Sequence, residues 1–352
     1  MQLQQRLKIL QSSLEDHQGL VLARPADIQY LTGFKTITSN EREAFLVVTK
    51  KSVTLLYPSF SPVEKIVGIE YFAGHWPSDL KKVITDASNH VSDSQEHKQQ
   101  VTDWQADLSA LFADEYQLIS NIKHTKWQTF SRDKIWQLRQ IKDHQELELF
   151  RAANQITLQA VKLLQAKLKI GMSEIEVARE FEYSAKKLGA TELAFPPVIA
   201  FGAHSALPHH QPTKTVLEPE QVVLIDVGAR VDGYCADLTR TIWFGNNPDQ
   251  QFLEIKNIVD TAYELAADQV KPEVFAADVD GAARKFIDDA GYGHQFIHST
   301  GHGLGLEIHE PPSLFMNSTQ KLRKNMLVTV EPGIYLDGRF GYRYENTITV
   351  ST

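Results

Sequence analysis

Cysteine is almost absent from this sequence. Cys235 is the single cysteine among 352 residues, so no disulfide can form within the chain, as is typical of proteins in reducing compartments. Long hydrophobic runs are also missing, because no stretch approaches the roughly 18 apolar residues that a membrane-spanning helix needs. The N-terminal segment lacks the apolar core and cleavage site of a signal peptide. These absences predict a cytoplasmic protein with no membrane partner.

An excess of positive charge is lacking as well. The sequence has 36 Lys and Arg against 44 Asp and Glu, a formal net charge of -8, and it contains no long basic run. Because nucleic acids and acidic membranes attract basic surfaces, we expect neither as a partner. Hydrophobic residues make up 42% and charged residues 23% of the chain, which is ordinary for a globular protein and argues against a disordered or fibrous one.

The length of the chain predicts two domains. In the first part, short apolar runs alternate with amphipathic segments, which is typical of a small α/β domain. The elements expected there are strands at 20–22, 44–48 and 53–57, helices at 78–87 and 103–112, and a polar surface loop at 91–100. Periodicity is lost after this region, and we place the domain boundary near residue 126.

Helical periodicity is strong after this boundary. Apolar residues recur at helical spacing over 143–168, and Gly171 follows as a stop signal. Ser173 and Glu176 form a capping-box pattern that starts a second helix, which ends near Leu188. The remaining expected elements are strands at 222–230, 234–244, 326–331 and 342–350 and helices at 250–270 and 274–290. This order predicts an α+β domain over residues 127–352.

Two carboxylates flank a predicted hairpin in this domain. Asp226 and Asp237 lie on either side of Asp232-Gly233, a dipeptide typical of hairpin turns. With a two-residue turn Asp237 pairs with residue 228, and with a loop over 230–233 it lies opposite Asp226. Both registers place the carboxylates on one face of the sheet. Because like charges at that range are unfavourable without a cation between them, a divalent metal is indicated; the alternative is one capping and one exposed Asp.

Histidines concentrate in a glycine-rich stretch of the second domain. His298, His302 and His309 fall within it, and glycines on both sides of His302 leave space around its imidazole. Neutral imidazole is a common ligand of divalent transition metals, so His302 is a candidate ligand. His309 is better placed as a second polar group than as a co-ligand. An isolated histidine is more often a core or surface residue, but three in one such stretch favour a site.

Two glutamates stand in predicted strands, where glutamate is disfavoured and rarely buried without a partner. Glu331 ends one apolar strand and Glu345 lies inside the next. A two-residue turn at Asp337-Gly338 places the two side chains on opposite faces, whereas a loop with an odd number of residues places them together, and the sequence leaves both open. The alternative for Glu345 is an exposed position with an ion pair to Arg343.

Together these residues resemble the pita-bread metallopeptidases, the family of Xaa-Pro aminopeptidases, Xaa-Pro dipeptidases (prolidases) and methionine aminopeptidases. The resemblance covers about residues 135–350 and extends to Leu207-Pro-His209 and to Arg343. Residues 1–126, with Tyr30-Leu-Thr-Gly-Phe34, resemble the N-terminal domain of the proline-specific branch. The resemblance therefore implies an α+β chain with a small N-terminal α/β domain over 1–126 and a pita-bread catalytic domain over 127–352.

The resemblance also implies a site with two divalent metal ions. Its implied ligands, in family order, are Asp226, Asp237, His302, Glu331 and Glu345. Such an oxygen-rich set suits Mn²⁺ best, with Co²⁺, Zn²⁺ and Fe²⁺ as alternatives. The implied catalytic residues are His209, His298, His309, Glu331 and Arg343. Glu331 would shuttle a proton, His309 and His209 would stabilise the reacting carbonyl oxygen, His298 would support the site, and Arg343 would orient Glu345 or a substrate group.

The activity implied is hydrolysis of the Xaa-Pro bond at the N-terminus of short proline-containing peptides, by a homodimer. Some prolidases carry an arginine where this chain has Ser313, and an arginine is a natural clamp for the carboxylate of a dipeptide. An Xaa-Pro aminopeptidase is therefore favoured, with an Xaa-Pro dipeptidase as the alternative. The rivals of the same fold are a creatine amidinohydrolase and a non-enzymatic binding protein, and such relatives typically lose the five-ligand set.

Overall fold

The structure is a computed structural model that describes residues 2–38, 41–74, 78–89 and 100–351. It divides into two compact units, Met1–Arg139 and Gln140–Thr352. The boundary predicted near residue 126 falls inside the first unit, because residues 126–129 form a strand of that unit's sheet. The predicted surface loop at 91–100 lies outside the described residues except for its last position.

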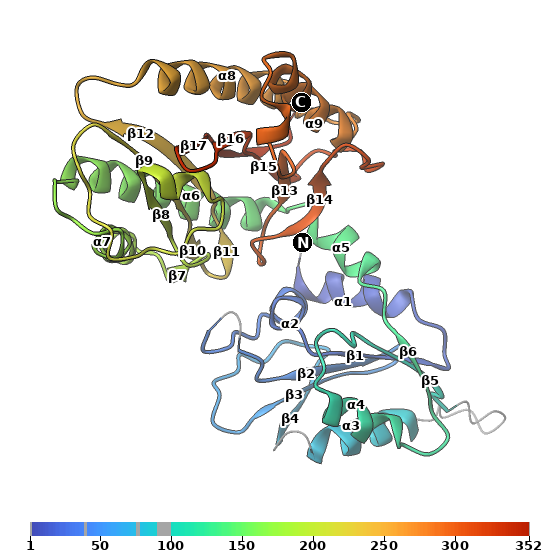
Figure 1. Ribbon diagram of the computed structural model, residues 1–352. Helices are drawn as coiled ribbons and strands as arrows, with labels where there is room; N and C mark the ends of the chain where they lie inside the picture. The colour runs from blue at the N-terminus through green and yellow to red at the C-terminus, as the bar shows by residue number, and fades with distance from the viewer. Residues whose placement is uncertain (1, 39–40, 75–77, 90–99, 352) are drawn as a thin grey trace. The chain divides into compact units, whose positions relative to one another are not determined.

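The first unit is built on a six-stranded mixed sheet with the order β4-β3-β2-β1-β5-β6. Its strands are β1 (Gln18–Leu22), β2 (Phe45–Thr49), β3 (Val53–Pro58), β4 (Glu70–Gly74), β5 (Asp103–Ala106) and β6 (Lys126–Thr129). Its helices are α1 (Leu3–Ser12), α2 (Pro25–Thr32), α3 (Ser78–Asn89), α4 (Ala113–Ser120) and α5 (Asp133–Arg139). The strands predicted at 20–22, 44–48 and 53–57 and the helix predicted at 78–87 are confirmed, as is the α/β class of this region (Figure 1).

The helix predicted at 103–112 is wrong, because its first residues form strand β5. This strand pairs in parallel with β1 on one side and β6 on the other. Trp104 is fully buried and stacks on Trp127 of β6, with ring centroids 5.8 Å apart. The space for its indole comes from Gly19 of β1, where an added Cβ would lie 2.5 Å from the ring. Packing against neighbouring strands therefore outweighs the local preference of this short segment.

The second unit contains two pairs of helices. They are α6 (His144–Lys167), α7 (Glu174–Lys187), α8 (Gln250–Ala267) and α9 (Ala276–Asp289). Side chains of α6 and α7 pack with those of the 198–244 strands in one apolar cluster, and side chains of α8 and α9 pack mainly with the C-terminal strands in another. The predicted capping box is present, since Ser173 accepts a hydrogen bond from Glu176 N at 3.3 Å. The four predicted helices of this unit are confirmed.

The strands of the second unit form several small sheets with the orders β11-β10-β7, β12-β9-β8, β14-β13-β15-β18 and β16-β17. The first group is β7 (Glu192–Leu193), β8 (Val198–Phe201), β9 (Gln221–Val227), β10 (Ala229–Val231), β11 (Tyr234–Cys235) and β12 (Leu238–Phe244). The second is β13 (Gly301–Gly303), β14 (Glu310–Leu314), β15 (Leu327–Val330), β16 (Gly333–Leu336), β17 (Phe340–Arg343) and β18 (Asn346–Thr349). Two short 3₁₀ helices, η1 (Gly202–Ala206) and η2 (Gly293–Gln295), complete the unit. The strands predicted at 222–230, 234–244 and 342–350 are thus each interrupted.

The first interruption lies at the acidic hairpin. Val231 pairs with Tyr234 across a two-residue turn at Asp232-Gly233, whose φ angles are 51° and 91°. The pairing of Asp226 with Thr239 continues the same register, which is the first of the two predicted alternatives. Between the paired segments the backbones approach closely, because a Cβ on Gly228 would lie 2.0 Å from the carbonyl oxygen of Ala236.

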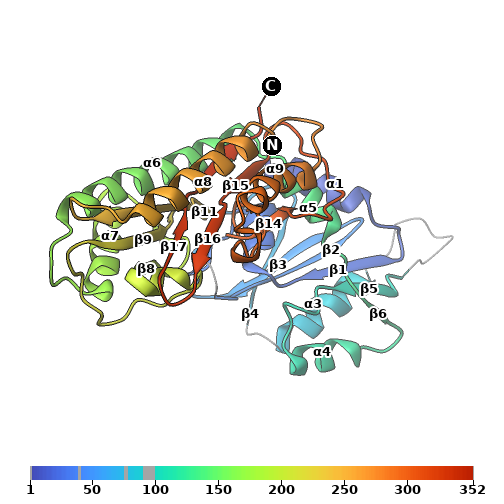
Figure 2. The same cartoon turned by 45° about the horizontal axis from the view of Figure 1, so that its top comes forward.

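A second interrupted hairpin carries the two late glutamates. Strands β16 and β17 lie side by side (Figure 2), and Leu336 pairs with Phe340 across a loop of odd length, residues 337–339. On the other side of the interruption Val330 pairs with Asn346. Both pairings belong to one register, in which Glu331 and Glu345 come opposite each other between the two paired segments. The odd-loop alternative is therefore confirmed.

Candidate metal centre

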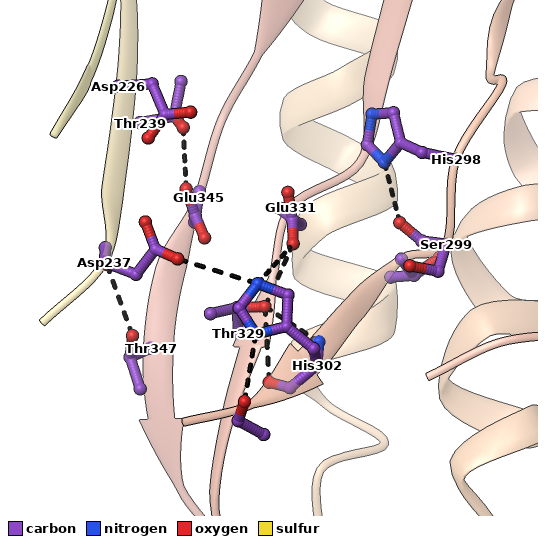
Figure 3. Close-up of polar contacts among 12 residues, drawn as sticks. Asp226, Asp237, Thr239, His298, Ser299, His302, Thr329, Glu331, Glu345 and Thr347 are labelled. Atoms are coloured by element: carbon purple, nitrogen blue, oxygen red, sulfur yellow. Dashed lines mark hydrogen bonds and ion pairs between the residues drawn. The ribbon is translucent and has the colours of Figure 1, made fainter. Parts of the chain in front are cut away.

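Both interrupted hairpins and the glycine-rich stretch meet at one cavity of about 650 Å³ in the second unit. The predicted site residues that line it are His209, Asp226, Asp237, His298, His302, His309, Glu331, Arg343 and Glu345. No residue of the predicted site is left outside. They come from segments far apart in the sequence, and Figure 3 shows the side chains of Asp226, Asp237, His302, Glu331 and Glu345 gathered together.

His302 lies at the centre of the carboxylates. Its Nε2 atom is 3.6 Å from Asp237 Oδ2 and 3.3 Å from Glu331 Oε1 (Figure 3). Its Nδ1 atom lies 3.0 Å from the carbonyl oxygen of Gly303, which can only accept, so Nδ1 carries the proton. The lone pair of Nε2 therefore faces the carboxylates, as a metal-ligating histidine requires. Donor atoms of Asp237, His302 and Glu345 all lie within 4.8 Å of one another.

Hydroxyl and guanidinium groups orient three of the carboxylates. Thr239 Oγ1 donates to Glu345 Oε2 at 2.6 Å, and Thr329 Oγ1 donates to Glu331 Oε1 at 3.1 Å. Arg343 Nη2 donates to Asp226 Oδ2 at 2.6 Å. The two threonines were not predicted from the sequence. Thr239 lies two positions from Asp237, and Thr329 lies two positions from Glu331, each on the same face of the chain as that carboxylate. This spacing is the sequence pattern from which the two threonines could have been predicted.

Two carboxylate oxygens in the cavity have no hydrogen-bond partner in the described part of the chain. Asp226 Oδ1 and Glu345 Oε1 are buried and accept no hydrogen bond from the described residues. A buried acceptor without a partner is unfavourable by about 1–3 kcal/mol, and more when charged. Hard or borderline divalent cations take carboxylate oxygens and a neutral imidazole as ligands. The donor set and its two unsatisfied oxygens therefore fit divalent metal ions.

Without a cation, the carboxylates raise one another's pKa. Burial, followed by the charges of the neighbouring carboxylates, raises the pKa of both Asp237 and Glu345 well above their ordinary values. Burial raises the pKa of Glu331 to about 7. Burial has the opposite effect on His302, whose pKa is lowered, so its imidazole is neutral at neutral pH. A bound cation would stabilise the ionised carboxylates and leave the imidazole as a ligand.

Removal of metal is expected to make stability fall as pH rises. The pKa of Glu331 rises from 4.5 in the unfolded chain to about 7 in the folded one. Its protonated form therefore stabilises the fold fully below pH 4.5, and this stabilisation is lost as pH rises through about 7. Melting temperatures of chelator-treated protein should therefore drop from about pH 5 to about pH 8, and those of metal-loaded protein should not. Glu331→Gln, which cannot ionise at this position, is the control and should make the metal-free profile less steep, because Asp237 and Glu345 still titrate with raised pKa values. Equal slopes with and without metal would contradict this expectation.

His298 is connected to the cluster through Tyr335, which the sequence did not reveal. The Nδ1 atom of His298 lies 2.8 Å from the carbonyl oxygen of Ser299 and therefore donates to it. The Nε2 atom of His298 then accepts from the Tyr335 hydroxyl at 2.8 Å. Burial, and then the charge of Arg343, lower the pKa of His298 to about 4. Arg343 Nη1 donates to the same hydroxyl at 2.6 Å. His298 thus fixes the tyrosine that supports Arg343 beside Asp226.

His309 and His209 lie on the cavity wall. The ring of His309 packs edge-to-face on that of His302, with centroids 4.5 Å apart, and it is outside the group of converging donor atoms. Burial, followed by the neighbouring His302, lowers the pKa of His309, so this imidazole is neutral at neutral pH. Both histidines are therefore available to contact a bound molecule.

A second group of potential ligands lies elsewhere in the same unit. Glu174, His204 and His210 also bring donor atoms within 4.8 Å of one another. None of them was predicted as a functional residue, since Glu174 reads as an ordinary residue of a helix first turn.

The chain matches known peptidases in sequence. Residues 148–352 match the model of metallopeptidase family M24. An uncharacterized peptidase of Staphylococcus aureus (strain USA300) is 32% identical over 342 residues, which cover 94% of this chain and 91% of the relative. One of Staphylococcus saprophyticus is 39% identical over 214 residues, which cover 61% of each chain.

Solved structures give the same result over nearly the whole chain. An Xaa-Pro dipeptidase from Bacillus anthracis is 30% identical, with a TM-score of 0.88 over 99% of this chain and 95% of that one. An X-Pro aminopeptidase from Thermotoga maritima is 28% identical, with a TM-score of 0.84 over 99% of this chain and 94% of that one. Both likenesses are to proteins named for cleavage next to proline.

Proposed function

The chain belongs to metallopeptidase family M24, and on this premise we propose that it is a dinuclear metal-dependent exopeptidase that hydrolyses the Xaa-Pro bond at the N-terminus of peptides. Its α+β pita-bread fold is that of the family. The observation that carries the proposal is the convergence of four carboxylates and one imidazole on a cavity in which two buried oxygens have no hydrogen-bond partner among the described residues.

The residues that would hold two divalent ions are Asp226, Asp237, His302, Glu331 and Glu345. Mn²⁺ is the first choice because oxygen ligands dominate, with Co²⁺, Zn²⁺ and Fe²⁺ as alternatives. When bound, such ions supply Lewis acidity, which lowers the pKa of water and polarises a carbonyl group. The remaining tasks of the reaction fall to side chains of the cavity.

Proton transfer is assigned to Glu331. Its Oε1 atom is held by the Thr329 hydroxyl, so the carboxyl group keeps one orientation while Oε2 takes no part in that bond. In the metal-loaded protein the group is an ionised carboxylate, which can accept a proton from water within hydrogen-bond reach. Glu331 would accept the proton of the attacking water and deliver it to the proline nitrogen of the departing product.

We assign to His309, together with His209, the role of binding the carbonyl oxygen of the scissile bond. A neutral imidazole can donate one N–H to an oxygen on which negative charge develops. Arg343 orients Asp226 through a 2.6 Å bond, and His298 holds the tyrosine that contacts Arg343. These two residues therefore act on the substrate through the carboxylates.

Apolar side chains in the cavity suit a proline ring. Phe195, Val198 and Ile308 line it together with Pro196 and Pro311. Proline is apolar and lacks an N–H group, so a wall of this kind accepts its ring without leaving a donor unsatisfied. This lining supports specificity for proline after the scissile bond.

The proposal is tested with the Mn²⁺-reconstituted protein on a panel of Ala-Pro, Ala-Pro-Ala, Met-Ala-Ser and creatine. Release of alanine from the proline-containing peptides is the expected result. Turnover of Met-Ala-Ser alone would indicate a methionine aminopeptidase, and turnover of creatine an amidinohydrolase. A protein that binds metal and turns over none of the four would be a binding protein of the same fold.

We further propose an aminopeptidase, with an Xaa-Pro dipeptidase as the alternative. Ser313 of β14 pairs with His302 and lines the cavity. A hydroxyl there lacks the charge-assisted bond that an arginine gives to a dipeptide's carboxylate, which is worth about 1.5–3 kcal/mol. We expect kcat/KM for Ala-Pro-Ala to equal or exceed that for Ala-Pro, and Ser313→Arg to raise the value for Ala-Pro about tenfold. Ser313→Gln, long but uncharged, is the matched control.

A preference of the wild type for Ala-Pro of about tenfold, about 1.4 kcal/mol, would instead establish the dipeptidase. The likeness to the dipeptidase from Bacillus anthracis is the observation that favours this alternative.

The homodimer, the cytoplasmic location and the absence of nucleic-acid and membrane partners also stay proposals. Among the described residues, no helix is both long and apolar enough to cross a membrane. Sedimentation of the purified protein at micromolar concentration measures the oligomer, and a monomer with full activity would contradict the dimer.

A further inference from the structure

A buried carboxylate at the start of α7 lies outside the proposed metal centre. Glu174 is fully buried. Its Oε1 atom accepts hydrogen bonds from Phe201 N at 2.9 Å and His204 Nδ1 at 2.8 Å. Its Oε2 atom accepts from His210 Nε2 at 2.9 Å and from Thr213 N and Oγ1 at 2.9 and 2.7 Å. Five donors therefore surround one carboxylate.

These contacts make Glu174 the acceptor of a hydrogen-bond cluster and leave no position for a metal ion. A carboxylate offers about four lone-pair sites, and here both oxygens are already shared by two or three donors. Burial raises the pKa of Glu174, but the hydrogen bonds from His210 and His204 outweigh it and lower the pKa to about 2. The group is thus ionised at any pH at which the protein functions.

All five donors belong to one segment, residues 201–213, which also carries His209 into the cavity. Leu207 N donates to the carbonyl oxygen of His204 at 3.0 Å, and His210 N donates to that of Leu207 at 3.1 Å. The rings of His204 and His210 stack with centroids 4.3 Å apart. The turn that presents His209 is therefore held on both sides by imidazoles bonded to the same carboxylate.

His209 depends on this turn for its position. Its side chain is exposed to the cavity, and no hydrogen bond from the described residues orients its imidazole. We propose that Glu174 is a positioning residue for the peptidase reaction, which fixes the Leu207–His210 turn through His204 and His210 and so places His209 beside the substrate. This inference rests on the proposed function, in which His209 contacts the scissile carbonyl.

Glu174→Gln tests the inference in a double-mutant cycle with His209→Ala. One end of a glutamine amide is a donor, so it repels part of the donor cluster. We expect Glu174→Gln to lower kcat about 10- to 100-fold, the size of a misplacement of about 1 Å, with KM and bound metal unchanged. His209→Ala should lower kcat about 10²-fold, and the double variant should be no slower than His209→Ala, because both changes remove one function.

The matched control is Glu220→Gln. Glu220 also gathers several donors, from Trp243, Asn246 and Asn247, but it does not line the cavity, so kcat should stay at the wild-type value. Losses that multiply in the double variant would overturn the inference. Loss of bound metal in Glu174→Gln would overturn it too, because it would make Glu174 a ligand.

A second pair of variants applies if Glu174→Gln does not fold. His210→Gln keeps a donor near the position of Nε2, whereas His210→Phe keeps a ring and loses the donor. The inference requires near wild-type kcat in the first variant and a fall of about tenfold or more in the second, and equal values in the two would overturn it.

A crystal structure of Glu174→Gln gives a readout that does not depend on activity. Displacement of residues 207–210 relative to the wild type is expected, and an unmoved turn would overturn the inference whatever the substrate. A wild-type protein that cleaves no Xaa-Pro peptide would instead overturn the proposed function, so the two failures are distinct.

Discussion

Asp237→Asn is expected to abolish most Xaa-Pro hydrolysis and to lower the amount of bound metal. Asp237 is buried, and its Oδ2 atom faces His302 Nε2 at 3.6 Å. A bound divalent ion contributes several kcal/mol of transition-state stabilisation, and each 1.36 kcal/mol of activation free energy corresponds to a factor of about ten in rate. We therefore expect a loss of about 10³-fold in kcat/KM, with metal content measured on the same samples.

In the absence of metal, Asp237→Asn should stabilise the folded protein. Burial and the surrounding carboxylates raise the pKa of Asp237, so a neutral amide of the same shape relieves repulsion when no cation is present. Asp237→Asn should then melt at a higher temperature than the wild type after chelation at about pH 8, and at a lower one with metal. Asp232→Asn, in the turn of the same hairpin, is the control, because asparagine suits that positive φ.

Full metal content and full turnover in Asp237→Asn would show that the acidic hairpin does not bind metal. A variant that keeps metal but loses turnover would move Asp237 from ligand to proton carrier. The comparison between metal-free and metal-loaded melting separates both cases from a general loss of folding.

The sequence was sufficient to predict that Asp226 and Asp237 lie on the same face of the sheet. The two registers considered for Asp226 and Asp237 differ in turn length, but each leaves both side chains on the same face, since strand residues alternate. The glutamates were a harder case. Whether Glu331 and Glu345 meet depends on the parity of the loop at 337–339, and Asp337-Gly338 is compatible with either length.

The sequence predicted little about the residues that hold the site. Thr239, Thr329 and Tyr335 are ordinary strand residues, and only the fold places their hydroxyls against Glu345, Glu331 and His298. Glu174 gives no signal either, because acidic residues are common in a helix first turn. The wrong helix at 103–112 has a related cause. Trp104 is buried by strands β1 and β6, which are distant in the sequence, and local pattern carries no information on them.

His309→Ala is expected to lower kcat for Xaa-Pro peptides by about 10²- to 10³-fold, the usual result of losing one donor to a developing oxyanion. The imidazole lines the cavity, and its pKa is lowered by burial and by His302, so it is neutral and can donate an N–H near pH 7. It lies outside the group of converging donor atoms. Bound metal and KM should therefore stay near wild type, since the donor acts mainly in the transition state.

The loss of the His309 ring also removes a packing contact with His302, whose centroid is 4.5 Å away. His309→Gln separates the two effects, because its amide keeps a donor, and it should recover part of kcat. His144→Ala, an exposed histidine at the start of α6, is the matched control with no expected change. If His309→Ala loses metal, His309 is a ligand. If kcat is unchanged, His309 only forms the wall of the cavity, and His209 is the remaining histidine that could donate to the oxyanion.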